Sequence, residues 1–453
     1  MIKRFGLAVL AVAFCATTSM AQQITPIWEF LITGDDSPLP ILKKNEPTGG
    51  ETSDGTDVYD SYGGLKRYDD TRLLLLVREN GINETDANHD AALAAAYPDR
   101  SLIWIDSFTG EPMGVALEIG LTPVALDPAL ASAGGSTIDY YMAFGVGDDG
   151  VIYSGHKNQL FKYEPNGDGT FGAPQVIYVH PNDGTDTWSA WRWETIKVSG
   201  SGTDTVILAG GKTWRSNQFT YYFTTTDGES FSPVTSAIGF RGGNSSAYMN
   251  EAGDEIYVIG GNFPGGASGF GVDIRREFTN PQFTEPFIRD ELFTFTAPAV
   301  DVEAQNFLNT YIGWFHSGFD AKTELPYFAV YSCPSWDTKD PGTAGSLGFA
   351  DDAANTPYLP GWLALHDAVT GEYIEGSSHM LPVYENTELD GDTIDGAQPS
   401  SRWHATLGDV QLNTLPNAAA GASELLWYSG VFGYGRYAIG DIGETNVPNW
   451  SLY

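Results

Sequence analysis

Cysteine, positive charge and long apolar runs are all scarce in this chain. The two cysteines are Cys15 and Cys333. Because Cys15 lies in an N-terminal segment that we expect to be removed, no intramolecular disulfide is expected. Stability must then come from burial, for which 24 Phe, 23 Tyr and 12 Trp supply ample aromatic area. Beyond the N-terminal segment, no apolar run is long enough to span a membrane.

The first 21 residues have the layout of a secretory signal peptide. Lys3 and Arg4 precede an apolar run, and small residues lead up to Ala21. We expect cleavage after Ala21, a secreted or periplasmic protein, and a single domain over residues 22–453. A lipoprotein attached through Cys15 is disfavoured, because Phe14 is too large for the small residue usual before a lipidated cysteine.

Lysine and arginine are outnumbered by acidic residues. The chain has 23 Lys and Arg against 58 Asp and Glu, a formal net charge of −35. A surface of this kind repels nucleic acid and anionic membranes unless its few cations are clustered. A solvated acidic coat accounts for the total, so we expect no nucleic-acid partner, and the positions of the few cations become the informative feature.

Histidine is also sparse and shows no metal-binding spacing. The seven histidines form neither H-x-H nor H-E-x-x-H, so a zinc site is not supported. The polar turns at 164–169 and 389–396 resemble calcium loops, but each lacks part of the ligand pattern. We expect no cofactor and keep calcium as an alternative.

What the chain does contain is a repeat. A β-branched or aromatic run follows a polar turn six times, and a second strand-like run precedes each copy, which is typical of a β-hairpin. The six copies lie at 69–80, 147–158, 202–213, 252–262, 324–334 and 422–432. The preceding runs lie at 64–68, 139–145, 194–200, 246–250, 309–315 and 405–412.

Further strand-like runs follow each hairpin. Residues 101–114 and 362–376 share the pattern D-x-x-T-G-E, in which the aspartate can cap a turn and Gly110 or Gly371 can adopt a positive φ. The last copy has a third run at 435–443 but no fourth, whereas the run at 25–34 has no hairpin of its own.

These units predict an all-β fold, a six-bladed β-propeller of four-stranded antiparallel blades. The N-terminal strand supplies the missing outer strand of the last blade and closes the ring, which leaves few exposed sheet edges. Seven blades is the alternative count, and a β-sandwich is the alternative fold.

The repeated blade with its D-x-x-T-G-E turn resembles the secreted bacterial quinoprotein-like and YncE-like propellers over most of residues 24–445. This resemblance implies a fold and brings no catalytic residue with it. The chain has no adjacent cysteine pair and no repeated tryptophan docking motif, so quinone dependence is not implied. The segment 224–231, TTTDGESF, is similar to the Asp box of sialidase-like propellers, without their arginine motif.

Ligands usually bind propellers where loops enter the first strand of each blade and leave the second. We call this end of the blades the mouth. Cationic, aromatic and amide residues gather at these positions: Arg78, Lys157, Trp188, Arg192, Lys212, Trp214, Arg215, Arg241, Asn244, Trp336, Arg402 and Trp403. Arginine donates two parallel hydrogen bonds to carboxylate or sulfate, and tryptophan stacks on sugar rings. We therefore predict that the mouth binds a small anion or, more specifically, an acidic carbohydrate.

Two other interpretations remain open. The protein could be a polysaccharide lyase or glycoside hydrolase, with His156, His404, Tyr62 and Tyr434 as candidates for acid or base. It could also be a protein-interaction scaffold, in which the arginines pair with aspartates between blades. Within the TWSAWRWE stretch we expect Trp191 and Trp193 to pack between blades, and Trp188 and Arg192 to face a ligand.

Overall fold

The fold is seen in a computed structural model, which describes many short ranges of the chain. They are residues 23–31, 62–77, 98, 101–119, 142–156, 158–181, 192–212, 219–235, 246–249, 255–262, 271–278, 288–295, 316–322, 325–333, 362–367, 374, 376–381, 408–415, 423–429 and 433–440. Everything below concerns these residues. The expected signal peptide lies outside them.

The strands of the first half form three four-stranded antiparallel sheets, each ordered as in the sequence. Blade 1 contains β2 (Tyr62–Arg67), β3 (Arg72–Val77), β4 (Ser101–Asp106) and β5 (Pro112–Glu118). Blade 2 contains β6 (Met142–Val146), β7 (Ile152–His156), β8 (Gln159–Tyr163) and β9 (Gln175–Val179). Blade 3 contains β10 (Arg192–Ser199), the short 3-10 turn η2 (Gly202–Asp204), β11 (Val206–Lys212), β12 (Phe219–Thr225) and β13 (Phe231–Thr235).

The second half forms three more sheets of the same kind. Blade 4 contains β14 (Ser246–Met249), β15 (Glu255–Asn262), β16 (Gly271–Phe278) and β17 (Ile288–Phe295). Blade 5 contains β18 (His316–Ala321), β19 (Tyr327–Cys333), β20 (Trp362–Asp367) and β21 (His379–Met380). Blade 6 contains β22 (Gly408–Thr414), β23 (Ser423–Ser429), β24 (Gly433–Ile439) and, from the N-terminus, β1 (Ile24–Leu31).

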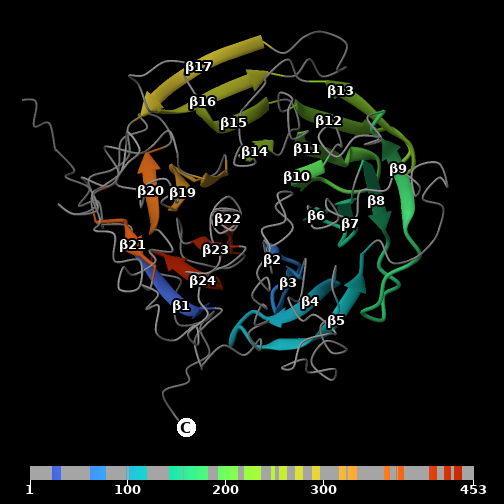
Figure 1. Ribbon diagram of the computed structural model, residues 1–453, viewed down its shortest axis with the longest axis horizontal. Coiled ribbons are helices and arrows are strands. Elements are labelled where there is room, and N and C mark those ends of the chain that lie inside the picture. Colours follow the sequence, from blue (N-terminus) through green and yellow to red (C-terminus); the bar gives the residue numbers. More distant parts are fainter. Residues whose placement is uncertain are drawn as a thin grey trace, which may run out of the picture.

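These sheets make a β-propeller, as the repeats predict. The first strands lie nearest the centre and the fourth strands at the rim (Figure 1). β1 pairs antiparallel with β24, from Ile24 opposite Ile439 to Leu31 opposite Gly433, and is the outermost strand of the last blade. The prediction that the N-terminal strand completes the last blade is therefore confirmed.

The first strands run in the same direction along the axis of the ring, and this common direction distinguishes the two ends of the molecule. The backbone amide of Asp148 after β6 donates to Gly200 after β10, and Asp320 of β18 accepts from Leu412 of β22. The turns that follow the first strands therefore share one end, which we call the far end. The starts of the first strands and the ends of the second strands share the mouth.

The prediction for the first strand of blade 5 is wrong in position. The first strand of blade 5 was expected at 309–315 because that run is aromatic and β-branched. The strand that pairs with β19 is β18, HSGFDA, at His316–Ala321. Its glycine and aspartate are unfavourable for strands on propensity alone, and position in the ring outweighs that preference.

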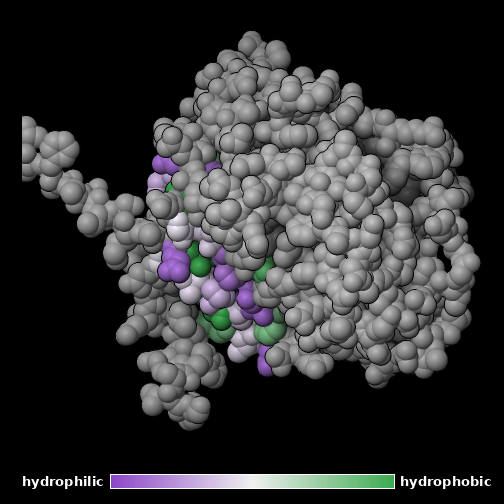
Figure 2. All heavy atoms as spheres, turned by 60° about the vertical axis from the view of Figure 1, so that its left-hand side comes forward, coloured by the Kyte–Doolittle hydropathy of each residue, from purple (hydrophilic) through white to green (hydrophobic). Residues whose placement is uncertain are grey.

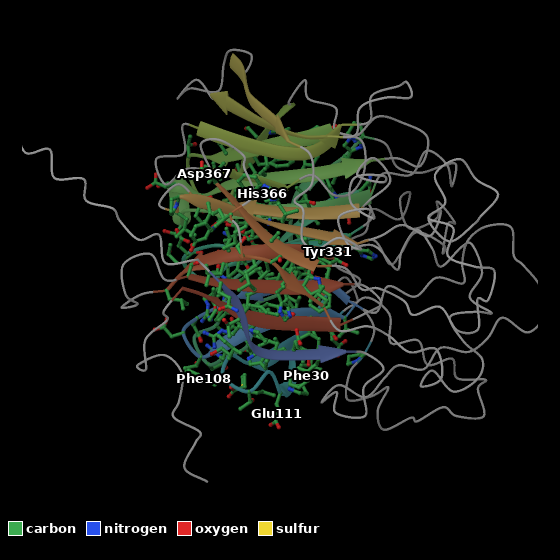
Figure 3. The ribbon with its side chains drawn as sticks, turned by 90° about the vertical axis from the view of Figure 1, so that its left-hand side faces the viewer. Phe30, Phe108, Glu111, Tyr331, His366 and Asp367 are labelled. Carbon is green, nitrogen blue, oxygen red and sulfur yellow. The ribbon has the colours of Figure 1, made fainter. Side chains whose placement is uncertain are left out.

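The D-x-x-T-G-E turn between β4 and β5 forms as expected. The Asp106 carboxylate accepts hydrogen bonds from the backbone amides of Phe108 and Thr109 at 2.8 and 3.0 Å. Gly110 adopts a φ of +76°, and Phe30 and Trp28 of blade 6 pack against it so closely that a side chain would not fit. In side view, Phe30, Phe108 and Glu111 lie on the same side of the propeller (Figure 3).

Apolar and aromatic side chains fill the spaces between adjacent blades, where the buried clusters combine residues of two neighbouring sheets. On the side that carries β1, β20 and β21, the visible described residues mix hydrophilic and hydrophobic types (Figure 2). Within the described ranges, there is no helix with the length and apolar character needed to cross a bilayer.

Candidate functional site

Two of the predicted mouth residues lie on described strands and are backbone partners. Arg192 begins β10 and Lys212 ends β11, and the two are directly opposite each other in the antiparallel pair. Such partners lie about 4.5–5.5 Å apart at their Cα atoms. Tyr62 begins β2 opposite Val77, at the mouth end of blade 1.

Most of the other predicted binding residues lie outside the described residues. These are Arg78, Lys157, Trp188, Trp214, Arg215, Arg241, Asn244, Trp336, Arg402 and Trp403, together with the candidate base His404. The prediction of a cationic and aromatic mouth at these positions therefore stays a prediction.

Two of the candidate catalytic residues, His156 and Tyr434, are buried. His156 ends β7 and is 2% exposed. Tyr434 is fully buried, packs edge-on against Trp28 and at a tilt against Phe30, and donates a hydrogen bond from its hydroxyl to the Gly110 carbonyl at 3.2 Å. Tyr434 therefore packs blade 6 against blade 1. Position at the end of a strand therefore does not determine whether a side chain is exposed.

Trp193 packs between blades 2 and 3, as strand alternation predicts. It is fully buried, and a Cβ on Gly155 of β7 would lie 2.5 Å from the Trp193 Cβ. Its ring lies edge-on to Tyr221 and His180. The His180 Nε2 atom shares a 2.8 Å hydrogen bond with the Tyr221 hydroxyl, and burial, followed by Tyr178, raises the pKa of Tyr221 to about 12. The Tyr221 phenol therefore stays neutral across the physiological range, and these aromatic side chains pack blade 2 against blade 3.

Four charged side chains from four blades meet near the axis of the ring. We call Lys66, Lys197, Asp320 and Asp409 the central charge cluster. The Lys197 Nζ atom of blade 3 lies 3.6 Å from an Asp320 oxygen of blade 5 and 3.5 Å from an Asp409 oxygen of blade 6. The innermost strands contact one another in the order β2, β6, β10, β14, β18, β22 and back to β2. Blades 3 and 6 are therefore on opposite sides, so the Lys197–Asp409 ion pair crosses the axis, whereas the Lys197–Asp320 pair joins two blades that are separated by blade 4.

The two lysines of this cluster differ in how firmly they hold a proton. Burial, reinforced by the positive charge of Lys197, lowers the pKa of Lys66 to about 7. Burial acts on Lys197 in the same direction, but Asp320 and Asp409 outweigh it and raise the pKa of Lys197. At neutral pH, Lys197 is thus firmly charged, whereas Lys66 can be either protonated or neutral. An amine with such a pKa is suited to proton transfer or to nucleophilic attack.

Sequence analysis did not single out these four residues. All of them lie inside strands, whereas ligand-binding residues were expected in loops. A signal was nevertheless present, because Lys66, Lys197 and Asp409 each interrupt an otherwise strand-like run on the first strand of a unit. Asp320 could not be found in this way, because its strand was assigned to the wrong segment.

A second buried group of charges joins the last blade to the first. We call Arg67, Glu424 and Arg436 the seam ion network. Glu424 is fully buried and accepts hydrogen bonds from Arg67 of β2 through both of its oxygens, and from the Arg436 Nε atom at 2.7 Å. Arg436 also donates to the Ser107 carbonyl of blade 1 at 2.6 Å. Burial acts to raise the pKa of Glu424, but the two arginines outweigh it and lower that pKa.

Among the described residues, no three His, Cys, Asp or Glu side chains are grouped closely enough to hold a metal ion. In the turn at 164–169, the Asp168 carboxylate accepts from the Thr170 backbone amide, and Asn166 donates to the Thr170 hydroxyl, both at 2.9 Å. The second turn resembling a calcium loop, at 389–396, lies outside the described residues.

No family model matches this sequence, and no curated protein matches it. Solved structures with a similar fold include an α-L-arabinanase of Penicillium chrysogenum complexed with arabinobiose, with 10% identity and a TM-score of 0.42 over 83% of this chain and 91% of the other. A DUF4623 family protein from Bacteroides eggerthii has 11% identity and a TM-score of 0.41 over 86% and 72%. An α-L-arabinofuranosidase of Fusarium graminearum has 8% identity and a TM-score of 0.40 over 84% and 96%. Function must therefore be inferred from this chain's own residues.

Proposed function

We propose that this protein is an exported, six-bladed β-propeller that binds an acidic carbohydrate at its mouth. The observation that supports this proposal is the pairing of Arg192 with Lys212 at the mouth end of blade 3. In a chain with a formal net charge of −35, two adjacent cationic residues form a local attraction for anions on a surface that otherwise repels them. The guanidinium of an arginine is suited to a carboxylate or sulfate group.

A carbohydrate is proposed, rather than another anion, because of the tryptophans that the sequence puts beside these cations. Trp188 lies four residues before Arg192, and Trp214 follows Lys212 by two. Aromatic faces stack on the apolar faces of sugar rings, while the cations neutralise acid groups on the same polymer. Export to the periplasm or medium, expected from the N-terminal segment, would bring the protein to such polymers. The resemblance to quinoprotein-like and YncE-like blades contributes only a fold to this proposal.

The test is binding to an immobilised uronate polymer, polygalacturonate, with its methyl-esterified form as the uncharged comparison. The double variant Arg192→Gln/Lys212→Gln should bind at least tenfold more weakly, because each charge-assisted hydrogen bond contributes about 1.5–3 kcal/mol. A matched control, Arg72→Gln/Lys322→Gln, removes two positive charges at the far end and should bind normally. Equal loss of binding in both double variants would contradict a site at the mouth.

The same incubation separates the competing functions. New unsaturated ends on the polymer would identify a lyase, and new reducing ends alone would identify a hydrolase. Retention without cleavage is the result expected for a binding protein. No interaction with any acidic polysaccharide would favour a protein-interaction scaffold over the proposal.

A further inference from the structure

The outer strands of two neighbouring blades carry the large exposed apolar side chains of the described ranges. They are Met113 and Val115 on β5, 48% and 39% exposed, and Val176 and Val179 on β9, 39% and 42% exposed. Both strands lie at the rim of the propeller, and within the described ranges each pairs with its own blade on one side only (Figure 1). Exposed apolar side chains on an open sheet edge are typical of strands that pair with another chain.

Rim strands are usually protected from such pairing by a charge, a proline or a short length. Five of the six rim strands have one of these features. β1 contains Pro26 and Glu29, β5 contains Pro112 and Glu118, β13 contains Pro233, β17 contains three consecutive charged residues, and β21 has two residues. The sequence of β9, QVIYV, has no charge and no proline. Among the described blades, β9 is therefore the one rim strand without these protections.

A bulge in β9 puts its two exposed valines on the same face of blade 2. The partners of Val176 and Val179 on β8 are two residues apart, and residues so spaced face the same side. Ile177 and Tyr178 pack instead against the cluster between blades 2 and 3. A bulge can itself protect an edge, but β5 has two register shifts and still contains a proline and a charge.

The sequence around β9 also lacks charge. From Gly169 to Pro181 it contains no Asp, Glu, Lys or Arg, in a chain whose formal net charge is −35. Pro174 and Pro181 lie on either side of the strand and lack the backbone N–H that a ladder needs. A partner recognised through its charge would find no group to bind here. A second copy of this chain offers an edge of the same length and the same lack of charge.

We propose that this protein forms a weak two-fold dimer, in which β9 of one copy pairs antiparallel with β9 of a second copy. A two-fold axis sets the same edge of each copy against the other, so that both open edges gain backbone hydrogen bonds at once. Val176 and Val179 of both copies lie beside the new strand pair and lose part of their contact with water. The proposal does not depend on the binding of carbohydrate at the mouth.

The response to salt distinguishes this dimer from one held by ion pairs. Two copies that each carry a large negative charge repel one another, and an uncharged contact supplies no electrostatic attraction to offset that repulsion. Salt screens the repulsion, so NaCl should strengthen the dimer. An interface made of ion pairs would weaken under the same conditions.

The experiment measures association of the purified protein by sedimentation equilibrium at low and high NaCl concentration. We expect a dissociation constant on the order of 10–100 µM, because five residues on each side make a small interface. Association should be tighter at high NaCl. As the protein concentration rises, deuterium uptake measured by mass spectrometry should fall in residues 175–179 and stay unchanged in residues 112–118.

Two double variants locate the interface. Val176→Lys/Val179→Lys puts like charges on both copies beside the strand pair, and should weaken association at least about tenfold. The matched control, Met113→Lys/Val115→Lys, makes an equal change of charge at exposed positions of β5 and should associate as the unmodified protein does. Both pairs of positions are exposed, so neither change disturbs the core.

Three results would overturn the proposal. They are a protein that stays monomeric at every concentration, association that both double variants weaken equally, and association that high NaCl abolishes. An uncharged strand peptide of unrelated sequence is the probe for a different occupant. If this peptide protected residues 175–179 from deuterium uptake while the protein stayed monomeric, the edge would bind a foreign strand, and the assignment of a second copy would be wrong.

Discussion

Lys66 and Arg67 are consecutive residues of β2, and each belongs to a buried group of charges. By strand alternation they face opposite sides, Lys66 toward the central charge cluster and Arg67 toward the seam ion network. In the seam ion network two arginines share one glutamate through several hydrogen bonds, one of them the 2.7 Å bond from Arg436. In the central charge cluster, Lys197 reaches two aspartates at 3.5 and 3.6 Å.

The difference follows from the chemistry of the two cations. A guanidinium is planar, remains charged and can direct several donors at one carboxylate, so it suits a permanent joint between blades. An ammonium is a point charge that loses its proton when it is desolvated beside another cation. The seam ion network therefore holds the last blade to the first, whereas the central charge cluster can change its charge near neutral pH.

The largest expected effect comes from breaking the seam ion network at its only carboxylate. Glu424→Gln removes the buried carboxylate that the buried Arg436 and the partly buried Arg67 share, and should lower the free energy of unfolding by about 3–5 kcal/mol. Because the folded-state pKa of Glu424 is lowered, its contribution is present above the ordinary glutamate pKa and is lost as pH falls through the folded value. Urea unfolding at pH 7 and pH 4 should show a smaller difference between the proteins at pH 4.

The matched control is Glu229→Gln, which removes a carboxylate that also faces a lysine but is 61% exposed. It should cost less than about 1 kcal/mol. If Glu424→Gln cost no more than this control, the seam ion network would not be what joins blade 6 to blade 1.

The second prediction concerns the central charge cluster, where removing a charge should raise the free energy of unfolding instead of lowering it. The folded-state pKa of Lys66 is about 7, below its ordinary value of 10.5. Keeping it protonated therefore opposes folding below pH 7, and this cost is relieved as pH rises from 7 toward 10.5. Relative to the unmodified protein, Lys66→Met should be more stabilising at pH 6 than at pH 9, by about 2–3 kcal/mol. Urea unfolding at both pH values measures the change.

Lys322→Met serves as the control for loss of a lysine outside the cluster. A gain from Lys66→Met that stays the same at pH 6 and pH 9 would mean that Lys66 keeps its proton in the folded protein.

The fold could be predicted largely because each blade carries its own local pattern. Polar turns, alternating strands and the unpaired run at 25–34 point to four-stranded blades completed by β1, and the Asp106 turn follows from its sequence alone. The failure at β18 shows the limit of this approach. A strand that contains Gly318 and Asp320 is set by its neighbours β19 and β22, which a local pattern cannot reveal.

The candidate site was less predictable for a similar reason. Arg192 and Lys212 could be found because they end strands of one hairpin, so that a single turn brings them together. The central charge cluster combines residues from 66 to 409, and only closure of the ring brings them within reach of one another. The spacing of residues along the sequence does not reveal contacts that cross the axis of the ring.

The smallest expected effect tests whether the difference between the two groups depends on the type of cation. Arg67→Lys keeps a positive charge beside Glu424 but loses the second donor to that carboxylate. It should lower the free energy of unfolding by about 1–2 kcal/mol at pH 7. The new lysine would lie near Arg436 much as Lys66 lies near Lys197, so its charge should be held less firmly. Lys322→Arg is the control for a neutral exchange of cations. If Arg67→Lys unfolded at the same urea concentration as the unmodified protein, the forked geometry of arginine would not account for the stability of the seam ion network. The difference between the two groups of charges would then have to come from the number of carboxylates that each contains.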